Sequence, residues 1–288
     1  MSTAEQLFKS AAPLLTLVDA IIPIAAKHTY TFVSDEWYQG WLHSAEFSIK
    51  RHNQIVAMEL IEKAHLASVT ALMRAKRWAE ATCLAYEKEN FLSWCASVRG
   101  LLESAGDTAD SLLNIPLTFA VRHRDLARYL AGNEERGMVV AEETERQLDH
   151  FVHAKWMRTK RGVENALKAK DNVDYVGALD QAIPNIKPLY HRLCSVCHPS
   201  SASIEYFYDI GAVPSLRLSP AKDKEAILGM CREYPEALFQ AIQAHCIPPF
   251  LILVVLHKFG AHPQLKALRL VDWKEITMGA EIMEALKG

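Results

Sequence analysis

A stripe of apolar residues spaced three to four apart runs through the first hundred positions of the chain. This spacing puts one side chain per turn on a single face of an α-helix, and that face is buried against a neighbour. We expect one helix to begin near Tyr38, a turn at Arg74–Arg77 and a second helix over 78–103. The first stripe contains Trp41, Ala45, Ile49, Ile55, Met58, Ile61, Leu66 and Val69, and the second Ala79, Cys83, Tyr86, Phe91, Trp94, Cys95, Val98 and Leu102.

The remainder of the chain also has helical spacing, and only 12 Gly and 12 Pro argue against a turn-rich β protein. We therefore predict an all-α, multi-helix bundle with an N-terminal helical and aromatic extension over 1–40 and a helical domain over 41–288. Further helices are expected over 3–27 with a break near Pro23, 109–131 with an interruption at Pro116, 133–170, 174–182, 222–234, 236–246, 249–259 and 271–287.

Charge and cysteine content indicate the compartment. A net charge of -2 gives no general attraction to nucleic acid or anionic membrane, so any such contact needs a local patch. The run Ala11–Ala26 contains Asp19 and is a poor signal peptide, and Phe250–Leu256 is too short to span a bilayer. The six cysteines lie in apolar segments, as small buried residues of a reducing compartment do. We expect a cytoplasmic protein with no membrane contact.

The segment 133–170 is acidic in its first half and basic in its second. A solvated helical face explains this pattern, and an arm whose basic half contacts phosphates explains it as well. Arg158, Lys160 and Arg161 belong to the basic half.

Reactive side chains are concentrated in the stretch 189–201, where three motifs overlap. Cys194, Cys197 and His198 spell C-x-x-C-H, the attachment motif of c-type haem. The same cysteines with His191 or His198 have the residue types of a zinc site. Arg192 and His198 stand six apart, as R-x5-H, which is the spacing of a class of metal-free ribonucleases.

The first two motifs lack support elsewhere in the sequence. Haem attachment of this kind follows export, and the export signal is weak. A structural zinc site needs a second ligand pair, and no compact C-x2-C or H-x3-H occurs. We therefore expect no cofactor and no metal.

The third motif needs only its own side chains. Cleavage of RNA through its 2′-hydroxyl needs a proton acceptor, a proton donor and a cation for the charge that builds on phosphate. His198 and Arg192 have this chemistry. Pro199 disfavours helix at the preceding residue, so His198 is expected at or just past a helix end.

The stretch Arg192-x5-His198, preceded by Tyr190 and His191, resembles the R-x4-6-H motif of HEPN domains, and more closely a poorly characterised bacterial branch of that superfamily. In that branch an upstream helix often carries an arginine and an acid one turn later, as Arg99 and Glu103 do. The resemblance implies a metal-independent endoribonuclease in stress or phage defence that acts on RNA. It also implies a homodimer in which two copies of the motif face each other.

A non-catalytic function stays open beside this one. Active HEPN nucleases tend to have a polar residue after the motif arginine, where this chain has Leu193. The alternative is a helical binding or interaction module in which Arg99, Glu103 and His198 form a structural network. The two hypotheses differ in whether Arg192 and His198 lie in a solvent-reachable groove or in packed core.

Overall fold

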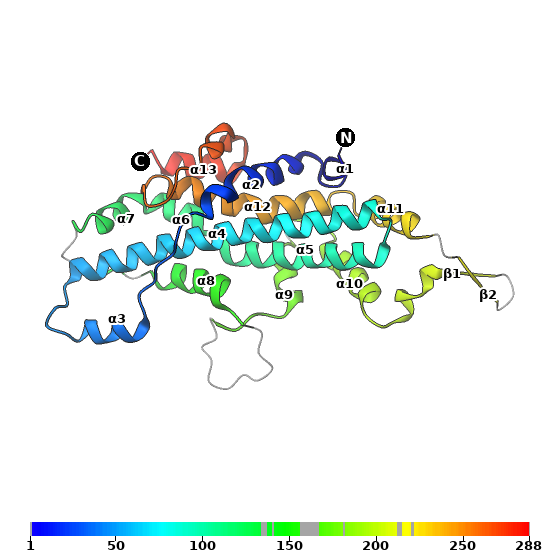
Figure 1. Cartoon of the computed structure of the whole chain (residues 1–288), viewed down its shortest axis with the longest axis horizontal. Helices are drawn as coiled ribbons and strands as arrows, with labels where there is room; N and C mark the ends of the chain where they lie inside the picture. Colours follow the sequence, from blue (N-terminus) through cyan, green and yellow to red (C-terminus); the bar gives the residue numbers. More distant parts are fainter. Residues whose placement is uncertain are drawn as a thin grey trace. The chain divides into compact units, whose positions relative to one another are not determined.

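The computed structural model of the chain describes residues 2–133, 137–139, 141–155, 167–180, 182–211, 215–219 and 222–287. Within these residues the secondary structure is helical apart from one short antiparallel pair of strands and an isolated bridge (Figure 1). This confirms the predicted all-α, multi-helix fold.

The chain packs into two compact units, each assembled from three separated segments. The first unit comprises Met1–Val18, Leu72–Asp110 and Asp171–Cys246, and the second comprises Asp19–Ala71, Ser111–Lys170 and Ile247–Gly288. The boundary predicted near residue 40 stays a prediction.

The N-terminal segment forms α1 (Thr3–Phe8), a 3-10 turn and α2 (Ala12–Ala25). Ser2 and Glu5 form a reciprocal capping box that fixes the start of α1. The break lies at Lys9, whose φ of 50° is left-handed, and α2 contains Pro23 without interruption. The prediction of a break near Pro23 was therefore wrong, and α2 accepts the loss of the one backbone hydrogen bond that an N–H at this position would make.

The segment that follows leads to α3 (Asp35–Leu42), capped by Ser34, and then to α4 (Ile49–Glu87). Helix α4 is 39 residues long and continues through the predicted turn at Arg74–Arg77, so that prediction was wrong. Arginine, alanine and lysine are strong helix formers. In addition, Arg74 Nη1 donates to Asp107 Oδ2 at 2.6 Å within the first unit.

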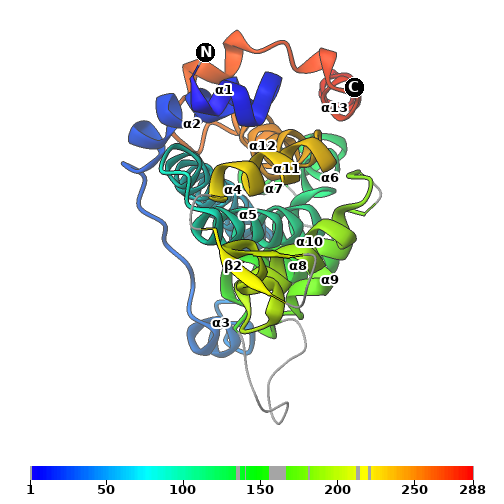
Figure 2. The same ribbon diagram turned by 90° about the vertical axis from the view of Figure 1, so that its right-hand side faces the viewer.

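Helix α5 (Phe91–Leu112) continues beyond the predicted end at Gly106, which was also an error of boundary. The glycine lies here for packing reasons: a Cβ atom at Gly106 would stand 2.2 Å from the carbonyl oxygen of Tyr175 in α9 (Asn172–Gly177). Similarly, Gly100 faces the Trp78 ring, so α5 lies directly against the end of α4 within the first unit, as both ribbon views show (Figures 1 and 2).

In the second unit, α6 (Ile115–Val121) begins with Pro116 in its first turn, as expected, and α7 (His123–Leu130) follows it. Of the predicted charged helix over 133–170, the structure has α8 (Glu142–His153), whose Asp149 pairs with Lys63 of α4 at 2.7 Å. Arg158, Lys160 and Arg161 lie outside the described residues.

The last third of the chain begins with α10 (Ile186–Cys197), followed by two 3-10 turns, at Ser201–Ser203 and Glu205–Phe207, and the strands β1 (Tyr208–Ile210) and β2 (Leu216–Leu218). The two strands pair antiparallel, Tyr208 opposite Leu218. Helix α11 (Asp223–Glu233) comes next, then α12 (Ala237–Leu256), two further 3-10 turns at Lys266–Leu270 and Trp273–Glu275, and α13 (Thr277–Ala285).

Helix α12 joins what the sequence predicts to be two helices. It continues through the buried Pro248 and Pro249, because burial of its apolar side chains outweighs the lost backbone hydrogen bonds. Two described stretches, Thr3–Ala25 and Ala237–Leu256, are long and apolar enough to cross a membrane, and the apolar window of the second is 67% buried within the fold. Phe250–Leu256 alone is too short to span a bilayer, but it is part of α12, whose 20 residues are long enough.

The two glycines Gly106 and Gly229 give a direct test of packing in the first unit. Gly106→Ala should lower the free energy of unfolding by ~1–3 kcal/mol, because the new methyl group collides with backbone that cannot rotate away. Gly229→Ala, in α11 with no atom within 4 Å of the new methyl, should raise it by ~0.5–1 kcal/mol. Urea denaturation followed by circular dichroism measures both, and equal effects would contradict the close approach at Gly106.

Candidate functional site

The end of α10 positions the predicted motif. Cys197 is the last helical residue, and His198 is the C-cap with extended backbone (φ -94°, ψ 155°). The His198 N–H still donates to the Cys194 carbonyl at 2.9 Å, so the helix stops only where Pro199 requires it. Ser200 Oγ donates to the Ser195 carbonyl at 2.6 Å and satisfies one of the free carbonyls of the last turn. The predicted place of His198 is confirmed.

Arg192 lies on the exposed side of α10. Its guanidinium pairs with the carboxylate of Glu233, the last residue of α11, and about half of each side chain is exposed (48% and 50%). The hydrogen bond from Arg192 lowers the pKa of Glu233. The guanidinium is therefore reachable from solvent although it has a carboxylate partner.

His198 and His191 are also exposed. The His198 imidazole makes no hydrogen bond or ion pair with any residue that the structure describes, and the His191 ring lies 6.3 Å from that of Tyr190. The motif residues are thus on the surface of the first unit, whereas Leu193, directly after Arg192, is fully buried. Leu193 holds α10 to the core and leaves the polar groups outside.

Arg99 and Glu103 form the predicted pair on α5, but their third partner differs from the expected one. Arg99 Nε donates to Glu103 Oε1 at 2.9 Å, and the Tyr190 hydroxyl donates to the same oxygen at 2.7 Å. The expected network through His198 is corrected accordingly: Tyr190, which is buried, takes that place because it lies on the inner face of α10. Burial and the hydrogen bond to Glu103 raise the pKa of Tyr190.

The cysteines of the stretch lie beside this network. Cys95 and Cys246 are buried as predicted, whereas Cys194 and Cys197, like Cys83 and Cys231 elsewhere, are half-buried rather than fully buried. Burial raises the pKa of the Cys197 thiol, and the nearby Arg99 partly opposes this. Burial also raises the pKa of Cys246 to about 12, so its thiol is unreactive at neutral pH.

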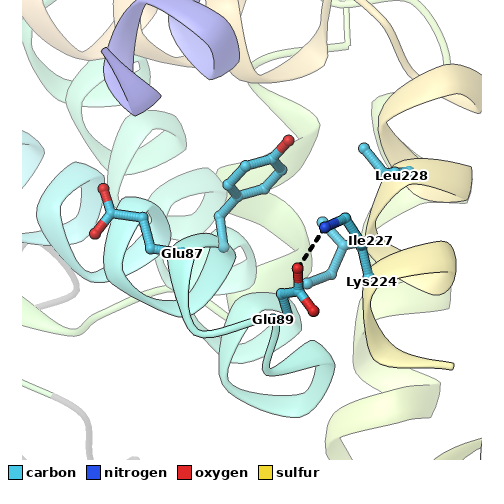
Figure 3. A pocket seen from close by; sticks show the side chains of 6 residues that line it. Glu87, Glu89, Lys224, Ile227 and Leu228 are labelled. Atoms are coloured by element: carbon cyan, nitrogen blue, oxygen red, sulfur yellow. Dashed lines mark hydrogen bonds and ion pairs between the residues drawn. The ribbon is translucent and has the colours of Figure 1, made fainter. Parts of the chain in front are cut away.

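A pocket of about 160 Å³ lies elsewhere in the first unit, between the end of α4 and α11, and neither Arg192 nor His198 lines it (Figure 3). Its charged groups already have partners. Lys224 Nζ bonds to Glu89 Oε1 at 2.5 Å, and Glu87 accepts from the Thr3 hydroxyl at 2.7 Å. The Lys224–Glu89 ion pair and the hydrogen bond to Glu87 thus engage the charged side chains of the pocket within the first unit.

The arrangement at the end of α10 has the groups for acid–base chemistry on an anion. An exposed imidazole can accept or donate a proton near neutral pH, and an exposed guanidinium can hold a phosphate through two hydrogen bonds. The Arg99–Glu103–Tyr190 network lies behind them and fixes the helix that carries both.

A second group of titratable side chains, in the second unit, was not predicted from the sequence. It contains His28, Glu62, His65 and His262. The spacing of Glu62 and His65 three apart on a helix was the one local signal, since it puts both on the same face. Nothing in the sequence indicates that His28 and His262 join them.

We expect Glu103→Ala to lower the free energy of unfolding by ~2 kcal/mol, because two donors lose a charged acceptor at a site only about a quarter exposed. Tyr190→Phe, which removes one of these hydrogen bonds, should cost ~1 kcal/mol. Glu80→Ala on α4, whose side chain is 46% exposed, is the control and should cost less than ~0.5 kcal/mol. Urea denaturation checks all three, and a Glu103→Ala effect no larger than that of Glu80→Ala would show that the network contributes nothing.

Comparisons of the chain with protein-family models, with curated proteins and with solved structures found no match. A function for this protein must therefore be argued from its residues and their geometry.

Proposed function

We propose that this protein is a HEPN-like, cytoplasmic, metal-independent endoribonuclease of stress or phage defence, with Arg192 and His198 as its catalytic residues. The observation that carries the proposal is the exposure of both side chains at the end of α10, in a stretch whose neighbours Leu193 and Val196 are buried. Exposure makes both side chains available to a substrate, which a buried arginine and histidine would not be.

The chemistry follows from the two groups. A neutral His198 takes the proton of a ribose 2′-hydroxyl, and the resulting oxygen attacks the adjacent phosphorus. The bond from phosphorus to the 5′-oxygen breaks, and that oxygen takes a proton from an imidazolium. Arg192 stabilises the additional negative charge on the phosphoryl oxygens. The products are a 2′,3′-cyclic phosphate and a free 5′-hydroxyl.

This reaction requires a base and an acid in the same step, and one histidine in one protonation state supplies only one of them. A second copy of the chain would bring a second His198. The proposal therefore includes a homodimer in which the ends of two α10 helices face each other.

Glu233 must release Arg192 when a phosphate binds. Ion pairs between half-exposed side chains contribute little to stability, so a phosphate that offers bidentate hydrogen bonds can replace the carboxylate. In the free protein the carboxylate of Glu233, at the end of α11, holds the guanidinium in a half-exposed ion pair.

The alternative is the non-catalytic helical binding module, and the same ion pair favours it. If Arg192 serves only to join α10 to α11, then Glu233 is its true partner and His198 is an ordinary surface residue. The two functions make opposite predictions for Glu233.

We expect Arg192→Ala and His198→Ala each to lower the rate of cleavage of total RNA by ~10²–10⁴-fold with the far-ultraviolet circular dichroism unchanged. Glu233→Gln should retain or increase cleavage, because it frees the guanidinium. His43→Ala is the matched control, since His43 is likewise an exposed histidine at a helix C-cap. Equal loss in Arg192→Ala and Glu233→Gln would indicate a structural pair, and no cleavage by the wild type would favour the binding module.

The products and the oligomeric state test the mechanism separately. Cleavage should leave a 2′,3′-cyclic phosphate, detected by its resistance to a phosphatase until acid treatment, and should continue in the presence of a chelator. Light scattering should give twice the chain mass of 32.4 kDa. Adding an excess of inactive His198→Ala protein to the wild type should lower the activity per wild-type chain only if the site is shared, because each mixed dimer then has a single His198.

A further inference from the structure

The second group of titratable side chains comes from three distant segments of the second unit. His28 follows the end of α2, Glu62 and His65 lie on α4, and His262 follows the end of α12. The chain turns after α12 through Gly260, which has a left-handed φ of 67°, and this brings His262 back over α4.

The ligand atoms of three of these residues converge. His28 Nε2 lies 2.8 Å from Glu62 Oε2, and His262 Nε2 lies 3.6 Å from Glu62 Oε1. All three atoms are within 4.8 Å of one another. The two carboxylate oxygens therefore face one imidazole nitrogen each.

The group is buried, and part of its hydrogen-bonding capacity is unused. The His262 side chain is only 2% exposed and that of Glu62 only 10%. Neither ring nitrogen of His262 has a hydrogen-bond partner, and His65 Nε2 has none either. An unsatisfied buried polar group destabilises the folded state, so a residue with two of them calls for a ligand.

A His28–Glu62 hydrogen bond alone does not account for this arrangement. It occupies one oxygen of Glu62 and leaves His262, the most buried of the three side chains, without a hydrogen bond, its Nε2 being 3.6 Å from the other oxygen. A cation between the three side chains can be bound by His262 Nε2, His28 Nε2 and a carboxylate oxygen of Glu62 at the same time.

We propose that His28, Glu62 and His262 bind one zinc-class divalent transition-metal ion, which clamps the segments after α2 and α12 onto α4. Two imidazole nitrogens and a carboxylate oxygen are a preferred ligand set of zinc, whereas calcium and magnesium prefer oxygen alone. Tetrahedral bonds of about 2.0–2.1 Å need ligand atoms about 3.4 Å apart. His28 and Glu62, whose ligand atoms are 2.8 Å apart, therefore separate to admit the ion, and the pairs that lie farther apart move closer. A water molecule takes the fourth position.

His65 acts as a positioning residue for the site. Its ring stacks on that of His262 with centroids 3.9 Å apart and planes at 5°, and its Nδ1 is bonded to the Tyr30 hydroxyl at 2.7 Å. This stack holds the His262 ring at the angle in which Nε2 faces Glu62.

Cys194 and Cys197 of α10 belong to the first unit and do not contribute ligands to this site. The expectation of a metal-free protein rests on the motif around those two cysteines. The clamp is independent of the proposed ribonuclease. A chelator is expected to lower the melting temperature of the protein without stopping RNA cleavage well below that temperature.

The test uses the full-length protein, stripped with a chelator and titrated with zinc chloride in a calorimeter. We expect one ion per chain and a rise of several degrees in the melting temperature. With cobalt as the probe, we expect the visible absorption of tetrahedral nitrogen and oxygen coordination, with no thiolate-to-cobalt charge-transfer band.

The variants decide which residues bind the ion. Glu62→Gln and His262→Gln should each weaken zinc affinity at least tenfold, while His65→Gln should weaken it less and alter the cobalt spectrum. Two controls should bind zinc as the wild type does. The first is His52→Gln, because His52 is a buried histidine of α4 that, like His65, bonds to a tyrosine hydroxyl. The second is the double variant Cys194→Ser with Cys197→Ser. No saturable binding by the wild type, or unchanged affinity in both Glu62→Gln and His262→Gln, overturns the proposal. Circular dichroism before each titration checks that a variant is folded. If His262→Gln does not fold, Glu62→Gln, which keeps the size of the side chain, provides the test.

Discussion

The carboxylate of Glu103 is the contact on which the proposed ribonuclease site depends. One of its oxygens accepts from Arg99 in the same helix and from Tyr190 in α10, so an acceptor on α5 fixes the inner face of the helix that carries Arg192 and His198. Buried Leu193 contributes on the same side. The polar residues of α10 are therefore held outward by what lies beneath them, and the exposure of the motif is a consequence of the core.

The helical class could be predicted from the sequence because apolar spacing reports burial over many residues at once. The helix boundaries could not be predicted, since proline and glycine, which usually end helices, also lie inside helices of this chain. Pro199 ends α10 as predicted, because its neighbours are exposed. Pro248 and Pro249 do not end α12, because they are buried, and Gly106 gives α9 room to approach. Exposed Pro23 also lies inside α2, so the residue type does not by itself fix where a helix ends.

The candidate sites show the same limit. Arg99 and Glu103 could be paired from the sequence because helix geometry alone brings residues four apart together. The Tyr190 contact could not, since the choice between Tyr190 and His198 depends on which face of α10 is turned inward. The group of His28, Glu62 and His262 could not be predicted from the sequence either, because its histidines are far apart along the chain and meet only in the folded second unit.

Each compact unit is built from three stretches of chain that alternate with the stretches of the other, and α4, α5 and α12 each contribute residues to both. No single cut in the sequence yields either unit whole. Neither can be expressed as a contiguous fragment. Because synthesis is vectorial, neither unit can close before the segment that completes it has left the ribosome, which is Asp171–Cys246 for the first unit and Ile247–Gly288 for the second.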